Sequence, residues 1–161
     1  MYDLSDHKGI STCLNQSDRI KVYSSDYSYR VRYADTDKMG YMYYGNYAVL
    51  YEIGRIELLR GLGLTYREME DDYRIMLPVA SVEARYILPA KYDEELIIRT
   101  KIEVKPTRVI AFGCEILNER AELIHKATVK LVFVSMDDQK SIPCPDFLMD
   151  KLSGYFESRE Q

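Results

Sequence analysis

The chain has 161 residues, a formal net charge of −4, 47% hydrophobic residues and 30% charged residues, a balance typical of one globular domain with its own core. A weakly acidic chain lacks the concentrated basic surface that nucleic acids require, and no run approaches the roughly 20 apolar residues of a membrane span. Three widely spaced cysteines fit neither a disulfide framework nor a zinc site, so we expect a cytoplasmic protein without a metal.

The first part of the chain predicts a polar extension, a strand and a buried helix. Residues 1–26 are polar and aperiodic and have no apolar core for a secretory signal, so we expect a flexible extension. "YSYRVRY" (27–33) alternates and is typical of a strand. "YAVLYEIGRIELLRGLG" (47–63) is apolar nearly all round in its first turns, which indicates a helix within the core. Gly54 inside this helix costs about 1 kcal/mol, which a close backbone contact would explain.

The second part of the chain predicts mainly strands. A short polar helix or turn over 65–73 comes first, with Thr65 and Glu68 as a candidate capping pair. Strands are expected at 77–89, 95–105, 108–117 and 123–136. The turn signals "KPTR" and "NERA" separate the last three strands, which favours antiparallel neighbours. A Pro-rich segment and a short helix are expected to follow.

This order of elements predicts an α+β fold. A helix that is apolar on most sides needs a sheet that curls around it. We therefore expect one long central helix wrapped by a curved antiparallel sheet of five to six strands, within a single domain over residues 27–161. Such a sheet leaves two exposed edges.

The loop "RYADTDKMGYMYYGN" (32–46) carries the residues with candidate chemistry. Asp35 and Asp37 stand just before the predicted helix, whose free N–H groups and dipole stabilise negative charge. An aspartate at this place either caps the helix or organises the loop, or acts on a substrate held at the helix start. Local sequence alone favours the structural role.

A longer stretch, "YADTDKMGYMYYGNYAVLYEIGRIELLRGLG", closely resembles the hotdog-fold acyl-CoA thioesterases of the 4-hydroxybenzoyl-CoA thioesterase family, and most of all the bacterial branch that acts on fatty acyl-CoA. The resemblance covers residues 27–140, and "YILPAKYDEEL" (86–96) is a second match. The matching positions in the first stretch are Tyr33, Asp35, Thr36, Asp37, Gly40, Tyr44, Asn46, Tyr47, Glu52, Arg55 and Glu57.

The resemblance implies hydrolysis of an acyl-CoA thioester, with no cofactor. It places the catalytic role on Asp37, as general base or nucleophile, and gives the backbone N–H of Tyr44 the role of polarising the thioester carbonyl. Many fatty acyl relatives have histidine at this position, so Tyr44 departs from that branch. The candidate substrate-binding residues are Gly45, Asn46, Tyr47 and Glu52.

Structural interpretations stand beside these roles. Asp35 is expected to organise the loop. Asn46 either caps the helix or contacts substrate, and Glu52 either pairs with Arg55 or faces the pocket. His125 lies within a strong strand pattern, where we expect a strand-pairing or surface residue.

Alternative functions follow from the same resemblance. The substrate is acyl-CoA or an acyl-carrier-protein thioester. A hotdog dehydratase would need a histidine paired with a carboxylate, and neither His7 nor His125 falls in the loop-to-helix region. A non-catalytic acyl-thioester binder would not need Asp37. Relatives pair their sheet edges, so we expect a homodimer or homotetramer with active sites at the dimer interface.

Overall fold

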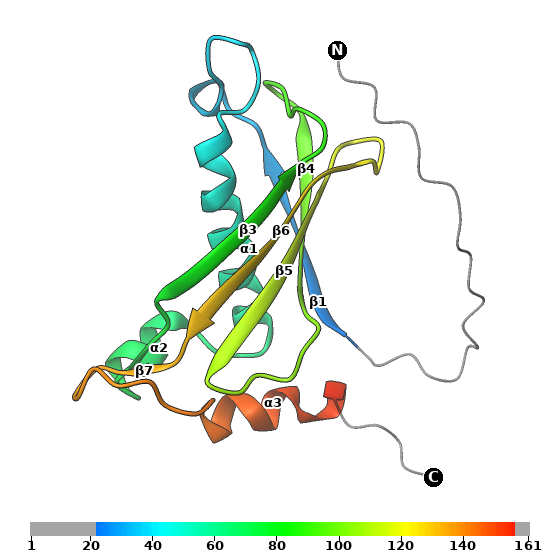
Figure 1. The fold of residues 1–161 in the computed structure, drawn as a ribbon. Helices are drawn as coiled ribbons and strands as arrows, with labels where there is room; N and C mark the ends of the chain where they lie inside the picture. Colours follow the sequence, from blue (N-terminus) through cyan, green and yellow to red (C-terminus); the bar gives the residue numbers. More distant parts are fainter. Residues whose placement is uncertain (1–21, 157–161) are drawn as a thin grey trace.

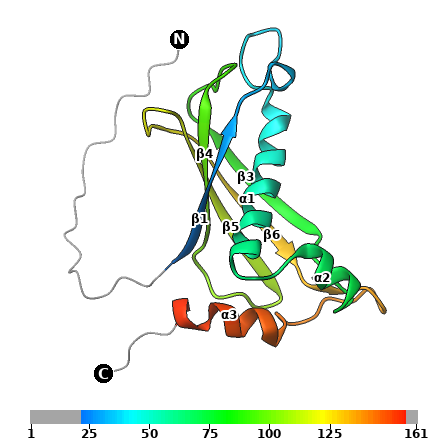
Figure 2. The same ribbon diagram turned by 180° about the vertical axis from the view of Figure 1, so that it is seen from behind.

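The computed structural model describes residues 22–156, in which one long helix packs on a five-stranded antiparallel sheet (Figures 1 and 2). The strands of this sheet are β1 (Tyr23–Arg30), β3 (Val79–Tyr86), β4 (Glu95–Ile102), β5 (Val109–Leu117) and β6 (Leu123–Val132). Their spatial order is β1-β4-β5-β6-β3. Two short strands, β2 (Ile75–Met76) and β7 (Val134–Ser135), pair separately. The predicted α+β architecture is confirmed.

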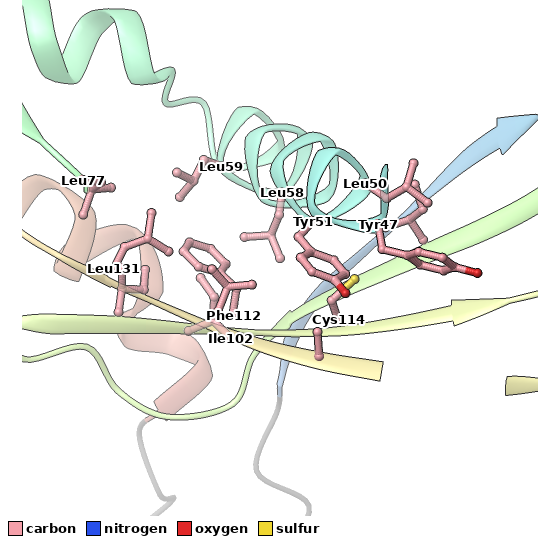
Figure 3. Close-up of a cluster of buried hydrophobic side chains, with 14 of the residues drawn as sticks. Tyr47, Leu50, Tyr51, Leu58, Leu59, Leu77, Ile102, Phe112, Cys114 and Leu131 are labelled. Carbon is pink, nitrogen blue, oxygen red and sulfur yellow. The ribbon is translucent and has the colours of Figure 1, made fainter. Parts of the chain in front are cut away.

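The central helix α1 (Tyr47–Gly61) lies along one face of the sheet and packs on β1, β4 and β5. Figure 3 shows the side chains that fill the space between helix and sheet. From the helix these are mainly Tyr47, Leu50, Tyr51, Leu58 and Leu59. The facing residues of β5 are Ile110, Phe112, Cys114 and Ile116, all buried. The predicted alternation of β5 is therefore the core-facing pattern. The predicted burial of the helix is confirmed only for the side that faces the sheet, because Ala48, Val49 and Glu52 in its first turns are exposed.

Gly54 is where the helix and the sheet approach most closely. A Cβ atom at this position would overlap the Thr100 hydroxyl and lie 3.0 Å from a methyl group of Ile98, both on β4. A larger residue would push α1 away from β4, so the predicted close contact at Gly54 is confirmed.

Two shorter helices lie at the end of the sheet opposite the 32–46 loop (Figure 1). The helix α2 (Tyr66–Asp71) starts with the predicted capping box, since Thr65 accepts from the Glu68 N–H and the Glu68 carboxylate accepts from the Thr65 N–H. The helix α3 (Asp146–Phe156) buries two leucines against the core. No helix within residues 22–156 is long and apolar enough to cross a membrane.

The first strand begins earlier than the sequence predicts. We expected a strand at 27–33, but β1 spans Tyr23–Arg30, so the expected extension over 1–26 is wrong at 23–26. The polar stretch "SSD" (24–26) does not look like a strand by itself, because the residues with which it pairs lie far away in the sequence, on β4. Asp26, for example, pairs in register with Arg99 of β4 and forms an ion pair at 2.7 Å. Residues 1–21 lie outside the described residues.

The strand β3 is an open edge of the sheet. All of its residues are exposed. Val82 and Tyr86 pair in register with the buried Val129 and His125, so they belong to the inner face, yet they are 48% and 51% exposed. The cause is the position of α1, which covers β1, β4 and β5 and leaves this part of the face bare.

Candidate active site

The 32–46 loop folds back on itself before it enters α1. Gly40 takes a positive φ of 77° and donates its N–H to the Asp37 carbonyl at 2.9 Å. Asp37 in turn donates its N–H to the Tyr41 carbonyl at 2.9 Å. A residue with a side chain would be strained at this φ, so the glycine permits the tight turn. The turn brings the chain from the carboxylates back to the helix start, which lies at one end of the sheet (Figure 1).

Asp35 holds this loop together. Its carboxylate accepts from the Tyr29 hydroxyl at 2.8 Å and from the Arg32 N–H at 2.7 Å. Its carbonyl accepts from the Tyr43 N–H at 2.8 Å and from the Asn46 side-chain amide at 2.9 Å. The residue therefore links β1, the loop and the start of α1, which confirms the structural role predicted for it.

Asp37 has far fewer partners. Its Oδ1 atom accepts from the Met39 N–H at 2.8 Å, and within residues 22–156 the carboxylate has no other hydrogen bond and no ion pair. The residue is half-buried. One of the two aspartates is thus engaged in structure, whereas the other keeps an oxygen atom available.

The N-terminal end of α1 has no side-chain cap. A 3₁₀ turn, η2 (Tyr44–Asn46), runs directly into the helix, so Asn46 already has helical backbone angles of −72° and −17°. A capping side chain needs an extended backbone to reach the next N–H groups. Asn46 instead donates to Asp35, and its predicted capping role is wrong. The N–H groups of Tyr44 and Gly45 open the turn and have no acceptor within the described residues.

Gly45 leaves room for the Tyr43 ring at the start of the helix. A Cβ atom there would lie 2.7 Å from Cε1 of the Tyr43 ring. The Tyr43 and Tyr44 rings contact each other at 4.7 Å between centroids and are 44% and 65% exposed. The predicted site residues Tyr44, Gly45 and Asn46 therefore lie together at an exposed aromatic end of the molecule.

Behind the helix start lies an aromatic cluster formed by Tyr47, Tyr51, Tyr86 and His125. The His125 ring lies 4.4 Å from that of Tyr47 and 4.6 Å from that of Tyr86, and it stacks on Tyr51 at 5.5 Å. Tyr47, a predicted substrate-binding residue, is only 3% exposed and points from α1 toward the sheet (Figure 3). The Tyr86 hydroxyl donates to the Tyr44 carbonyl at 3.2 Å, so the cluster touches the helix start directly.

His125 is fully buried in this cluster, so its expected surface position is wrong, although it does pair with Ile116 and Tyr86 in the sheet. Its Nε2 atom and the Tyr51 hydroxyl form a hydrogen bond, whereas its Nδ1 atom has no partner. Burial lowers the pKa of His125 to about 4 and raises the pKa of the Tyr51 hydroxyl. His125 and Tyr51 are therefore both uncharged at neutral pH.

The alternation along β6 indicates that His125 faces the core. Along β6, every second residue from His125 onward is apolar and buried, ending with Leu131. A residue in step with such a series belongs to the core face of the strand.

Glu52 lies on the exposed side of α1. No ion pair links it to Arg55 in the described part of the chain, so that predicted pair is wrong. The carboxylate of Glu57 pairs instead with Arg60, one turn further along the helix. Among the candidate substrate-binding residues, Glu52 thus lies apart from the helix start.

Comparison with known proteins covers the loop, the helix and the sheet. Residues 31–152 match the family described as "Thioesterase-like superfamily". The "Putative acyl-CoA thioesterase YneP" of Bacillus subtilis is 37% identical over 112 residues, which are 70% of this chain and 80% of that protein. The "Acyl-CoA thioesterase YbgC" of Haemophilus influenzae is 28% identical over 72% of this chain and 85% of its own length.

A solved structure of a DHNA-CoA thioesterase from Staphylococcus aureus superposes with a TM-score of 0.75 and 31% identity, over 82% of this chain and 88% of that one. A 4-hydroxybenzoyl CoA thioesterase mutant, solved with 4-hydroxybenzoyl CoA, superposes with a TM-score of 0.72 and 21% identity, over 78% and 96% of the two chains. The second likeness concerns the fold alone. Together they confirm the hotdog fold expected from the sequence.

Proposed function

The chain belongs to the thioesterase-like superfamily, and we propose that it hydrolyses an acyl-CoA thioester to the free acid and CoA. The observation that carries this proposal is the contrast inside one loop. The Asp35 carboxylate accepts two hydrogen bonds that hold the loop together. The Asp37 carboxylate accepts only one within residues 22–156, so one of its oxygen atoms is available close to the uncapped start of α1. Free N–H groups and an available base are the two requirements of acyl transfer.

In the proposed reaction the thioester carbonyl lies at the start of α1, where the N–H of Tyr44 donates to its oxygen. The helix dipole adds to this stabilisation as negative charge develops on the oxygen. Asp37 takes a proton from water, which attacks the carbonyl carbon, and the tetrahedral intermediate then expels the CoA thiolate. Direct attack by the Asp37 carboxylate, giving a mixed anhydride that water hydrolyses, leads to the same products.

The relatives support a CoA thioester as the substrate, since the names of YneP and YbgC both specify acyl-CoA. An acyl-carrier-protein thioester is the alternative, because the reacting carbonyl and sulfur are the same in both. Gly45, Asn46, Tyr47 and Glu52 remain our proposed substrate-binding residues. Of these, Gly45 carries one of the two N–H groups without an acceptor within the described residues, and Asn46 is the next residue. Tyr47 belongs to the aromatic cluster behind the helix start.

Release of CoA thiol from a panel of acyl-CoAs tests this function, with the acyl group varied in length and from aliphatic to aromatic. We expect turnover of at least one member, and a loss of about 10²- to 10⁴-fold in Asp37→Ala. Equal rates in the wild type and in Asp37→Ala would contradict the catalytic role of Asp37. Tight binding of an acyl-CoA by the wild type without hydrolysis would instead identify a binding protein.

We also propose that two copies pair along β3. No other strand of residues 22–156 pairs with the outer edge of β3, and its inner-face residues Val79 and Val82 are each 48% exposed. Val49, on the bare flank of α1, is 53% exposed. A second copy would cover these apolar side chains and close the site from one side, and two dimers would give the tetramer.

Light scattering at micromolar concentration tests the pairing. We expect at least twice the 18.8 kDa of one chain. The substitution Val82→Lys places a charge on the proposed contact and should shift the protein toward monomer. Val104→Lys, at a position that is 67% exposed beyond β4, is the matched control. A wild-type mass of one chain would contradict the proposal.

A further inference from the structure

We propose that Tyr86 is a positioning residue for thioester hydrolysis, acting through the peptide group that joins Tyr44 and Gly45. Its hydroxyl orients this peptide so that the Gly45 N–H becomes a second donor to the thioester oxygen, beside the N–H of Tyr44. The inference rests on the proposed function and extends it to a residue on another element of the fold.

The hydrogen bond from Tyr86 determines the direction of a neighbouring N–H. The Tyr86 hydroxyl donates to the Tyr44 carbonyl at 3.2 Å. The C=O of Tyr44 and the N–H of Gly45 belong to one planar trans peptide, in which they point in opposite directions. Because the carbonyl is held from the side of β3, the Gly45 N–H is directed away from it, out of the helix start.

The same hydrogen bond strengthens the Gly45 N–H as a donor. The Tyr44 carbonyl also accepts from the Tyr47 N–H, which closes the 3₁₀ turn η2 and is shared with the Gly45 carbonyl. A carbonyl oxygen has two lone pairs and can accept both bonds. Each bond polarises the peptide group, with a cooperative gain of about 10–30% per bond. The Gly45 N–H has no acceptor within the described residues, so this polarised donor is free for a ligand.

Tyr86 can act in this way because buried residues fix its ring. Although Tyr86 is 51% exposed, its ring meets that of Tyr47 edge-on at 5.3 Å and that of His125 at 4.6 Å. His125 is itself held by its hydrogen bond to Tyr51 and by stacking on the same ring. A half-exposed hydroxyl on an edge strand is thereby positioned by the interior of the protein.

Tyr86→Phe tests the inference, because it removes the hydroxyl and keeps the ring in its cluster. A hydrogen bond worth about 0.5–1.5 kcal/mol corresponds to a fall in kcat of about twofold to thirteenfold. KM should not change, since the effect acts on the charge that develops during the reaction. A rise in KM with unchanged kcat would contradict the proposed role.

The chain offers a matched control at the other end of α1. The Tyr23 hydroxyl donates to the Leu58 carbonyl, also at 3.2 Å. Tyr23→Phe therefore removes the same kind of hydrogen bond from the same helix, far from the helix start. Because the Tyr23 bond is less exposed than the Tyr86 bond, Tyr23→Phe should lose at least as much stability as Tyr86→Phe. A fall in kcat is expected in Tyr86→Phe alone. Equal kcat values in the two variants would overturn the inference.

A second readout does not depend on turnover. Protein labelled with ¹⁵N-glycine is titrated with a ketone analogue of acyl-CoA, in which a methylene replaces the thioester sulfur. The Gly45 amide proton should move downfield on binding in the wild type and in Tyr23→Phe, and less in Tyr86→Phe. An unresponsive Gly45 amide in the wild type would also overturn the inference.

These outcomes separate the inference from the function on which it rests. If the wild type hydrolyses no thioester, the proposed function fails. If the wild type is active and Asp37→Ala is not, but Tyr86→Phe is as fast as Tyr23→Phe, only the role of Tyr86 fails. Light scattering of Tyr86→Phe confirms that the phenylalanine ring leaves the assembly unchanged.

Discussion

The two ends of α1 differ in how their backbone groups are satisfied. At the C-terminal end, the N–H groups of Leu62, Gly63 and Leu64 all donate back into the last turn, at 2.9–3.1 Å. Leu58 and Leu59 beside them are fully buried. At the N-terminal end there is no side-chain cap, and the opening N–H groups have no partner in the described chain.

We propose from this difference that the residues that stabilise the fold and the residues that act on substrate lie at opposite ends of α1. Backbone N–H groups in folded proteins nearly always donate to another protein group, to water or to a ligand. The closed end of α1 is therefore the part that we expect to hold the fold, and the open end the part that we expect to bind. Substitutions at either end test whether the two roles are separate.

The largest effect on stability is expected from Leu58→Ala at the closed end. The substitution leaves a cavity in the core and should lower the free energy of unfolding by about 2–5 kcal/mol. Chemical denaturation measures this loss. Val104→Ala, at an exposed position, should change the value by no more than about 0.5 kcal/mol. Because Leu58 lies far from the helix start, kcat per folded molecule should stay near the wild-type value, and a large fall in kcat would break the division.

A smaller loss is expected from Asp35→Ala at the open end. Two donors, the Tyr29 hydroxyl and the Arg32 N–H, lose their acceptor. We expect the free energy of unfolding to fall by about 1–3 kcal/mol. Asp37→Ala loses only the exposed bond from Met39 and should change stability by less than about 1 kcal/mol. Equal losses in the two variants would mean that the aspartates do not have separate roles.

The third expected effect is a change in the pH dependence of stability, which appears only below about pH 6.5. Burial lowers the pKa of His125 to about 4, whereas in the unfolded chain it titrates near its ordinary value of 6.5. Between these values the unfolded chain holds a proton that the folded one lacks, so stability falls as the pH falls from 6.5 toward 4. The contribution is at most about 1.4 kcal/mol per pH unit. Burial raises the pKa of the Tyr47 and Tyr51 hydroxyls beside the ring, so these two groups stay neutral over this range.

Denaturation at pH 7.5, 6.5, 5.5 and 4.5 measures this contribution in the wild type and in His125→Gln. The variant cannot titrate at this position, so its stability should depend less on pH below 6.5. Parallel curves for the two proteins would show that His125 does not contribute.

Much of the fold could be predicted because its signals are local. The alternation along β4 and β5 follows from one face of the sheet being buried, and the structure confirms it. The apolar first turns of α1 correctly predicted a helix against the core, but only the side that faces the sheet is buried. The start of β1 could not be predicted in this way. Asp26 is polar and is typical of a turn. It lies in the sheet because it pairs with Arg99 on the neighbouring strand, which a local pattern does not reveal.

The candidate site was predictable in part. The family resemblance pointed to Asp37 and Tyr44, and the structure places both in the loop that leads into α1. The contact of Tyr86 with the Tyr44 carbonyl joins residues 42 positions apart and depends on the register of β3, which no short motif encodes. The missing cap at Asn46 depends on a 3₁₀ turn ahead of the helix, and Asn is common both as a cap and in loops.

If the Asp37 carboxylate at the open end of α1 acts in the hydrolysis, replacing it with an amide should remove activity and leave the fold intact. Asp37→Asn keeps an oxygen that can accept from the Met39 N–H and removes the base. With the best acyl-CoA of the panel, kcat should fall by at least about 100-fold, while the free energy of unfolding of the same preparation stays within about 0.5 kcal/mol of the wild type. An unchanged kcat, or a fall fully explained by unfolded protein, would show that the Asp37 carboxylate does not take part in the hydrolysis.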